Sequence, residues 1–137
     1  MVSVRSLHLL VGVGGVLAFL GTGAWMATHF PGAYAGGETI RYMYRANHVY
    51  LLLASLVNLA IGMYRGGSRP GWRGNLALTG SALVVAAPFL LFYAFFVEPA
   101  HGVPERPATL IGAVMLLAGV LVQWPNRASL KGNREEG

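Results

Sequence analysis

Residues 76–97 read LALTGSALVVAAPFLLFYAFFV and contain no Asp, Glu, Lys or Arg. A helix of about 20 such residues is long enough to cross the hydrocarbon core of a bilayer. Three further apolar stretches lie at about 7–27, 42–64 and 109–124. We therefore predict an all-α integral membrane protein, in which four transmembrane helices form a single domain over residues 1–124.

The amino-acid composition agrees with a membrane protein. Apolar residues make up 55% of the chain and charged residues 11%, about half the charged share of a typical soluble domain. There is no cysteine, which excludes disulfides, thiolate metal sites and cysteine nucleophiles. The net charge is +5, but the charges flank the apolar stretches. This placement indicates contact with membrane lipids and not with nucleic acid.

The distribution of basic residues predicts the orientation of the chain. One side of a four-span arrangement collects Arg5, Arg65, Arg69, Arg73, Arg127, Lys131 and Arg134. The other side has fewer arginines, offset by carboxylates: Arg41, Arg45, Arg106, Glu38, Glu98 and Glu105. Both termini are therefore expected to be cytoplasmic, with a polar tail at 125–137. Short connections favour antiparallel neighbours, so we predict an up-down four-helix bundle. The compact, Arg-rich and Lys-poor chain points to the cell membrane of a bacterium, that is, its inner membrane.

A cleaved signal peptide is the alternative interpretation of the first stretch. Residues Met1 to Arg5 resemble a charged leader, and Ala33-Tyr34-Ala35 has the small-x-small form of a cleavage site. The apolar run is longer than the 7–15 residues usual for a signal, and the candidate cleavage site lies well beyond its end. Cleavage would leave three spans, with the termini on opposite sides.

Helical periodicity assigns small and polar residues to faces. One face of the first stretch carries His8, Gly12, Gly15, Phe19, Thr22 and Met26. A second ridge of that stretch consists of Gly14, Ala18 and Gly21. The most polar face belongs to the second stretch and contains Arg41, Arg45, His48, Ser55, Asn58 and Gly62. The fourth stretch places Thr109, Gly112, Leu116, Gly119 and Gln123 together. We expect the polar face to point into the bundle and the small residues to permit close helix contacts.

Two residues near the middle of the bundle have predictable consequences. Pro88 removes the helical hydrogen bond to the carbonyl of Val84 and is expected to kink the third helix. Asn58 lies mid-span, where an amide without partners is costly. We expect Asn58 to hydrogen-bond across the bundle, to Thr22, to Thr79 or to a backbone carbonyl.

The start of the second stretch is the candidate ligand site. Arg41, Arg45 and His48 are spaced by four and three residues, so they line one face of its first turns. The positive end of the helix dipole adds to their potential. A lipid phosphate, an acidic ligand or a quinone carbonyl would be stabilised there, as would Glu98 or Glu105. Asn58 is the deeper candidate for a substrate or quinone contact.

Metal or haem binding is a second possibility at the same end. His29, His48 and His101 with Glu98 are donors suited to zinc, copper or iron. No HxxxH or HExxH pair is present, so such a site depends on loop conformation. Haem would require His48 with His29 or His101, because His8 lies at the opposite end of its helix and cannot share one haem with His48.

Two familiar four-span classes can be tested by the residues that they require. The chain resembles small multidrug exporters in length and span number, but no carboxylate occurs between Arg5 and Glu38 to match their intramembrane glutamate. It is similar in size to membrane-bound glutathione and eicosanoid enzymes, and the segment 45–48 resembles their arginine- and asparagine-rich second helix. The glutamate expected in that helix is absent between Tyr50 and Tyr64. We claim membership of neither class.

These observations favour a non-catalytic accessory or scaffold subunit of a membrane assembly. No catalytic constellation, nucleotide loop or intramembrane acid is visible, whereas glycine ridges offer surfaces for packing within or between chains. The expected partners are lipids and other membrane subunits or further copies of the chain. The alternative is a redox or enzymatic protein with a metal, haem or quinone near His48. Transport would need a polar path across the bundle, and only Gly62 and Gln123 suggest its inner half.

Overall fold

The computed structural model describes residues 3–33, 37–64, 71–101 and 105–123, and it is all-helical over this part of the chain. The helices are α1 (Val4–Ala33), α2 (Glu38–Tyr64), α3 (Trp72–His101) and α4 (Pro107–Gln123). Each predicted apolar stretch lies within one of these helices, apart from residue 124, and the helices extend beyond the stretches by a few residues. The predicted tail at 125–137 and most of the predicted cleavage site lie outside the described residues.

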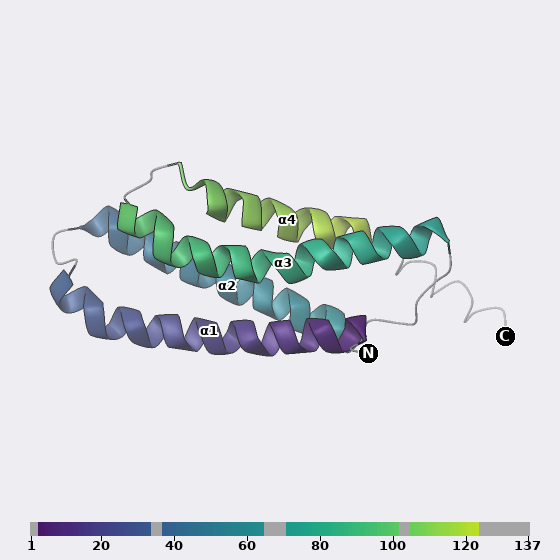
Figure 1. Ribbon diagram of the computed structural model, residues 1–137. Coiled ribbons are helices and arrows are strands. Elements are labelled where there is room, and N and C mark those ends of the chain that lie inside the picture. The colour runs from purple at the N-terminus through teal and green to yellow at the C-terminus, as the bar shows by residue number, and fades with distance from the viewer. Residues whose placement is uncertain (1–2, 34–36, 65–70, 102–104, 124–137) are drawn as a thin grey trace, which may run out of the picture.

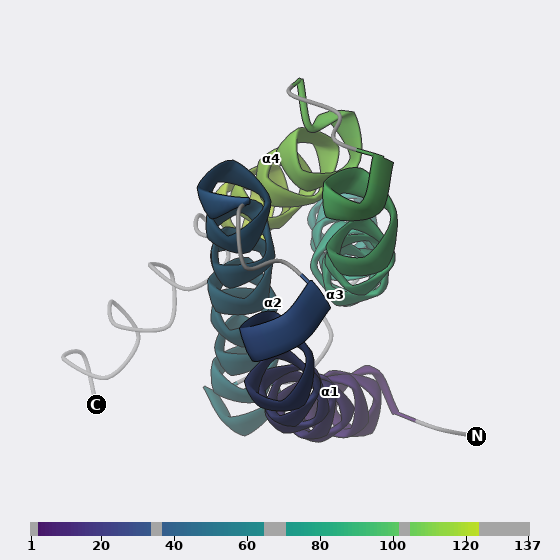
Figure 2. The same ribbon diagram turned by 90° about the vertical axis from the view of Figure 1, so that its left-hand side faces the viewer.

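Consecutive helices run antiparallel and side by side (Figure 1). The end-on view in Figure 2 shows α1 and α4 at opposite ends of the arrangement, with α2 and α3 between them. The main contacts join α1 to α2, α2 to α3 and α3 to α4, whereas α2 and α4 touch at few points. We name the two ends of the bundle by their residues: α2 begins at the Glu38 end, and α1 begins at the Val4 end.

Three of the four helices, α1, α2 and α3, have the length and apolar composition of membrane spans. α4 is a shorter apolar helix of 17 residues, or about 25 Å, which is at the lower limit for crossing the hydrocarbon core. The outward surface carries large apolar side chains such as Leu17, Phe89 and Leu110, each more than 60% exposed. Such a surface suits a lipid environment and would be unusual in water.

The predicted faces of α1 and α4 are confirmed. All five predicted residues of α4 are its buried ones, and His8, Gly12, Gly15 and Thr22 are buried on α1. The second ridge of α1 points the other way: a Cβ built on Gly14 or Gly21 would meet nothing within 4 Å.

The prediction for α2 holds over one half of the helix only. Ser55, Asn58 and Gly62 are buried, whereas Arg45 is exposed. The residues buried towards the Glu38 end are Met43, Tyr44, Asn47 and Leu51. The physical reason is that Tyr44 packs edge-on against Phe95, at 5.1 Å between ring centroids, and so turns the aromatic side of α2 inwards and Arg45 outwards.

Backbone-to-backbone approach at glycines sets the helix spacing. A Cβ on Gly12 would lie 2.9 Å from the backbone nitrogen of Leu59, and a Cβ on Gly62 would lie 3.0 Å from that of Leu9. Between α3 and α4, a Cβ on Gly119 would lie 2.7 Å from the carbonyl oxygen of Gly80. These contacts are possible only without a side chain, as at the small-residue interfaces of membrane helices.

Candidate functional site

A buried amide on α2 links three helices in the half of the bundle nearer the Val4 end. Asn58 donates through Nδ2 to the carbonyls of Ala54 and Val84, both at 2.9 Å. Both Nδ2 hydrogens are then used, so Oδ1 faces His8 and accepts from its Nδ1 at 2.8 Å. Asn58 and His8 are fully buried. The amide therefore ties α1, α2 and α3 together at one depth.

The hydrogen bond from Asn58 to the Val84 carbonyl replaces one that Pro88 cannot donate. Pro88 lies inside α3 and has no N–H to donate to the carbonyl four residues before it, which is that of Val84. In a bilayer such a carbonyl would have no water to bond. Asn58 supplies the missing donor from the neighbouring helix. The prediction that Asn58 bonds across the bundle, with a backbone carbonyl among its candidate partners, is confirmed.

A second buried network joins α2, α3 and α4 towards the Glu38 end. Glu98, which is 3% exposed, accepts from the backbone N–H groups of Ala108 at 2.6 Å and Thr109 at 3.0 Å. The hydroxyl of Thr109 bonds the other Glu98 oxygen and lies 2.7 Å from Asn47 Oδ1. Arg106 also donates to Asn47 Oδ1. A carboxylate from α3 thus caps the positive N-terminus of α4.

Asn47 anchors this network to the helices on both sides. Its Nδ2 donates to the carbonyl of Ala94 on α3 at 3.0 Å. The next carbonyl, that of Phe95, lies four residues before Pro99 and so has no helical N–H donor. Asn47 is fully buried. Two asparagines on α2 therefore hold α3 beside its two internal prolines, at two depths of the bundle.

Thr109→Val tests the value of this second network. Valine keeps the shape of threonine and the backbone N–H groups but removes the hydroxyl shared by Asn47 and Glu98. We expect the free energy of unfolding in detergent to fall by about 1 kcal/mol. The matched control is Thr79→Val, because Thr79 is exposed and bonds only the Asn75 carbonyl of its own helix. Equal losses in both variants would contradict a role for the network.

The structure gives His48 a contact with α1. Thr22 donates its hydroxyl proton to the Phe19 carbonyl, so its oxygen accepts from His48 Nδ1 at 2.9 Å. The imidazole stacks on the Phe19 ring at 3.9 Å between centroids. Gly23 leaves room for the ring edge, since a Cβ there would lie 3.2 Å from Cε1. His48 is half-buried, and a cofactor at this residue stays a prediction.

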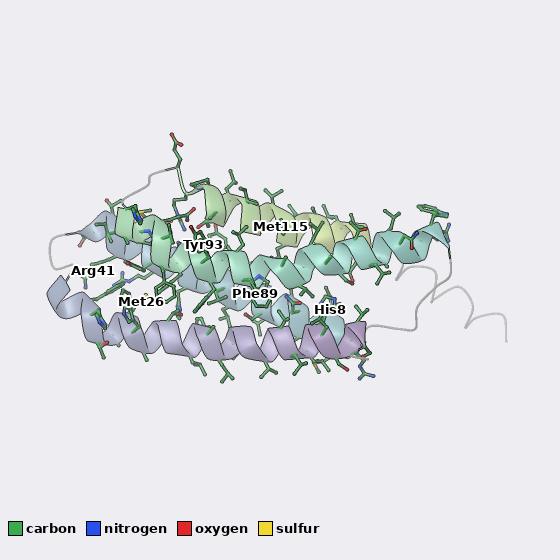
Figure 3. The ribbon with its side chains drawn as sticks, in the orientation of Figure 1. His8, Met26, Arg41, Phe89, Tyr93 and Met115 are labelled. Carbon is green, nitrogen blue, oxygen red and sulfur yellow. The ribbon has the colours of Figure 1, made fainter. Side chains whose placement is uncertain are left out.

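In the structure, the side chains of Arg41, Arg45 and His48 have different environments and do not form one anion-binding face. Arg45 is exposed, whereas the Arg41 guanidinium lies 5.6 Å from the centre of the Phe30 ring. Glu98, one of the anions expected at these arginines, bonds the first turn of α4 instead. Figure 3 shows Arg41 and His8 at opposite ends of the bundle. His8 bonds Asn58, which lies about 15 Å along α2 from His48, in agreement with the expectation that His8 and His48 cannot share one haem.

The four candidate metal ligands are not brought together. His29 and His101 are exposed and bond carbonyls of their own helices, those of Trp25 and Val97. Glu98 is drawn inwards by the N–H groups of α4. Over the described ranges, no group of three His, Cys, Asp or Glu residues is placed to hold a metal ion.

The residues that sequence reasoning missed are Asn47, Arg106 and Thr109, together with the inward position of Glu98. One signal for them was present: Arg106-Pro107 marks the start of a helix, because proline favours its first turn, and the carboxylate of Glu98 precedes it closely in sequence. Such a pair predicts a cap across a short connection. A comparison of the chain with protein-family models, with curated proteins and with solved structures finds no match.

Proposed function

We propose that this chain is a multi-pass protein of the cell membrane that acts as a non-catalytic accessory or scaffold subunit, with the outward ridge of α1 as its packing surface. In this proposal α4 also crosses the membrane, and both termini are cytoplasmic. The support comes from how the polar and the small residues of the described part of the chain are used. The polar residues are bonded within the chain, and membership of an assembly accounts for the small residues that face outwards.

The buried polar side chains hold the chain's own helices together. Asn58 bonds α1 and α3, Asn47 bonds α3 and α4, and Glu98 caps α4. Each of these groups meets its partners at hydrogen-bonding distance, which favours a structural role over a reactive one.

The observation that carries the proposal is the outward orientation of Gly14 and Gly21. On the same helix, Leu59 and Ser55 of α2 occupy the space beside Gly12 and Gly15. Gly14 and Gly21 face open space instead. Gly14 and Ala18 form a small-xxx-small pair, a pattern that lets membrane helices approach closely. A helix that uses one glycine ridge internally and keeps a second outside is suited to packing against another helix.

Cross-linking from a single cysteine tests the proposal. The natural chain has no cysteine, so Ala18→Cys places one thiol on the ridge. In native membranes, a short reagent with a maleimide at one end and a photoreactive group at the other is expected to join Ala18→Cys to a discrete partner, either another protein or a second copy, which mass spectrometry identifies. Adding Gly14→Ile should remove this product by blocking close approach, without lowering the melting temperature of the purified chain.

The matched control is Leu121→Cys, on an exposed position of α4 (59%). It should yield no discrete product, because α4 has no outward small-residue ridge. The proposal fails if Ala18→Cys gives no product, or if Ala18→Cys and Leu121→Cys give the same products.

A further inference from the structure

A hollow of about 240 Å³ opens beside the first turns of α4. Its lining consists of Tyr50, Glu105, Arg106, Thr109, Leu110 and Ala113. Tyr50 belongs to α2 and the others to α4 or the residues just before it, so the hollow lies in the groove between these two sparsely touching helices. Sites for drug-sized molecules usually exceed about 300 Å³. The hollow therefore suits a small group and not a whole substrate.

Arg106 brings a guanidinium to this hollow that is only partly bonded. Its Nη2 reaches Asn47 Oδ1 and Thr109 Oγ1. Its Nε is buried and has no acceptor within the described part of the chain, a state that a bound ion or water would explain. The backbone φ of Arg106 is 46°, in a region that non-glycine residues rarely adopt and that is enriched at ligand clamps. An acceptor with negative charge would complete the site.

The helix terminus itself does not hold this acceptor. The N–H groups of Ala108 and Thr109 are already taken by Glu98, so Arg106 is the donor that remains. Beside it, the exposed Glu105 borders the same hollow with the opposite charge. The complement of this pair is a zwitterion with an anionic group towards Arg106 and an amine towards Glu105.

The depth of the hollow fits a lipid head group. α4 has 17 residues, or about 25 Å, so in the proposed arrangement, in which α4 crosses the membrane, its first turn lies close to the boundary between hydrocarbon and head groups. Leu110 is 62% exposed and the aromatic Tyr50 is 38% exposed. They offer an apolar surface and an interfacial ring directly beside the charged pair.

We infer that this hollow binds the phosphoethanolamine head group of a membrane phospholipid. The phosphate accepts hydrogen bonds from Arg106, the ammonium group lies against Glu105, and an acyl chain follows Leu110 and Ala113 along the groove between α2 and α4. α1 and α4 lie at opposite ends of the arrangement (Figure 2), so the head-group site goes beyond the scaffold role of the α1 ridge and can fail independently of it.

Native mass spectrometry of the delipidated full chain tests this inference. The protein in detergent is given an equimolar mixture of dioleoyl phosphatidylethanolamine, phosphatidylcholine and phosphatidylglycerol. We expect phosphatidylethanolamine to be retained about three- to tenfold more than phosphatidylcholine, whose methylated amine cannot donate hydrogen bonds to a carboxylate. Glu105→Gln should abolish this preference, whereas Glu38→Gln, which changes an exposed carboxylate at the start of α2, should preserve it.

Arg106→Asn tests the phosphate contact, since asparagine tolerates the positive φ of this position. It should lower retention of all three lipids. Soluble phosphoethanolamine and inorganic phosphate are added in separate experiments, and neither is expected to displace the lipid. Displacement by either compound would overturn the assignment to a lipid. Equal retention of phosphatidylethanolamine and phosphatidylcholine, or an unchanged preference in Glu105→Gln, would overturn the head-group site.

Discussion

Asn58→Leu should lower the free energy of unfolding by about 2–3 kcal/mol, the larger of the expected losses among polar substitutions. Leucine has the same γ-branched shape and the same number of side-chain heavy atoms as asparagine, so the change leaves no cavity. The change removes the donor to the Val84 carbonyl and the acceptor for His8 Nδ1. Both groups would then be buried without these partners. Thermal or denaturant unfolding of the purified chain in detergent measures the effect.

A double-mutant cycle with Pro88→Ala separates the contribution of the Asn58–Val84 hydrogen bond from the other effects of Asn58→Leu on stability. Alanine at position 88 restores an N–H that can bond Val84 within α3. In the Pro88→Ala background, Asn58→Leu should then lower the free energy of unfolding by about 1 kcal/mol less than it does in the natural chain. Ser55→Ala is the matched control, because Ser55 is buried on α2 but bonds only the Leu51 carbonyl of its own helix. The same cost for Asn58→Leu in both backgrounds would refute the link with Pro88.

Gly119→Ala is expected to destabilise the bundle by about 1–3 kcal/mol, since overpacking forces helices apart. The added Cβ would lie 2.7 Å from both the carbonyl oxygen of Gly80 and Cγ2 of Val84. Neither contact can be relieved by moving the far end of a flexible side chain. Unfolding of the purified chain, followed by circular dichroism, measures the loss.

Substitutions on α1 provide the control for this effect. Gly12→Ala should also destabilise, because its Cβ would lie 2.9 Å from the backbone nitrogen of Leu59. Gly14→Ala, two residues away, meets nothing within 4 Å and should leave stability unchanged or slightly raised, because alanine favours helix over glycine. Equal losses at Gly12 and Gly14 would contradict the role of helix contact, because only a Cβ on Gly12 meets α2.

The sequence predicted the helices and their contact faces best where small residues line a face. The buried face of α4 and the glycines of α1 follow directly from helical periodicity, because close approach selects residues without bulk. The face of α2 near its start was wrong at Arg45. Aromatic packing at Tyr44 determines the rotation of that turn. Periodicity alone does not predict which of two adjoining faces of a helix is buried.

The candidate site was less predictable because its bonds join residues far apart in the chain. Asn58 could be recognised as a buried amide in need of partners, and Val84 as a carbonyl freed by Pro88. Their pairing depends on the relative depth of α2 and α3, which no local pattern encodes. Glu98 was one of the loop carboxylates expected as possible partners of Arg41 and Arg45, but it accepts from the N–H groups of α4, which are fixed in place.

If α4 crosses the membrane as proposed, the cap that Glu98 places on α4 has a consequence for membrane insertion. When α3 leaves the ribosome alone, the Glu98 carboxylate has none of its later donors, since Ala108 and Thr109 lie in the next helix. A lone carboxylate near the end of an apolar segment is costly to place in lipid. Once Pro107–Gln123 has been synthesised, the two helices can enter as one hairpin with the charge already enclosed. We therefore expect α3 and α4 to be integrated together.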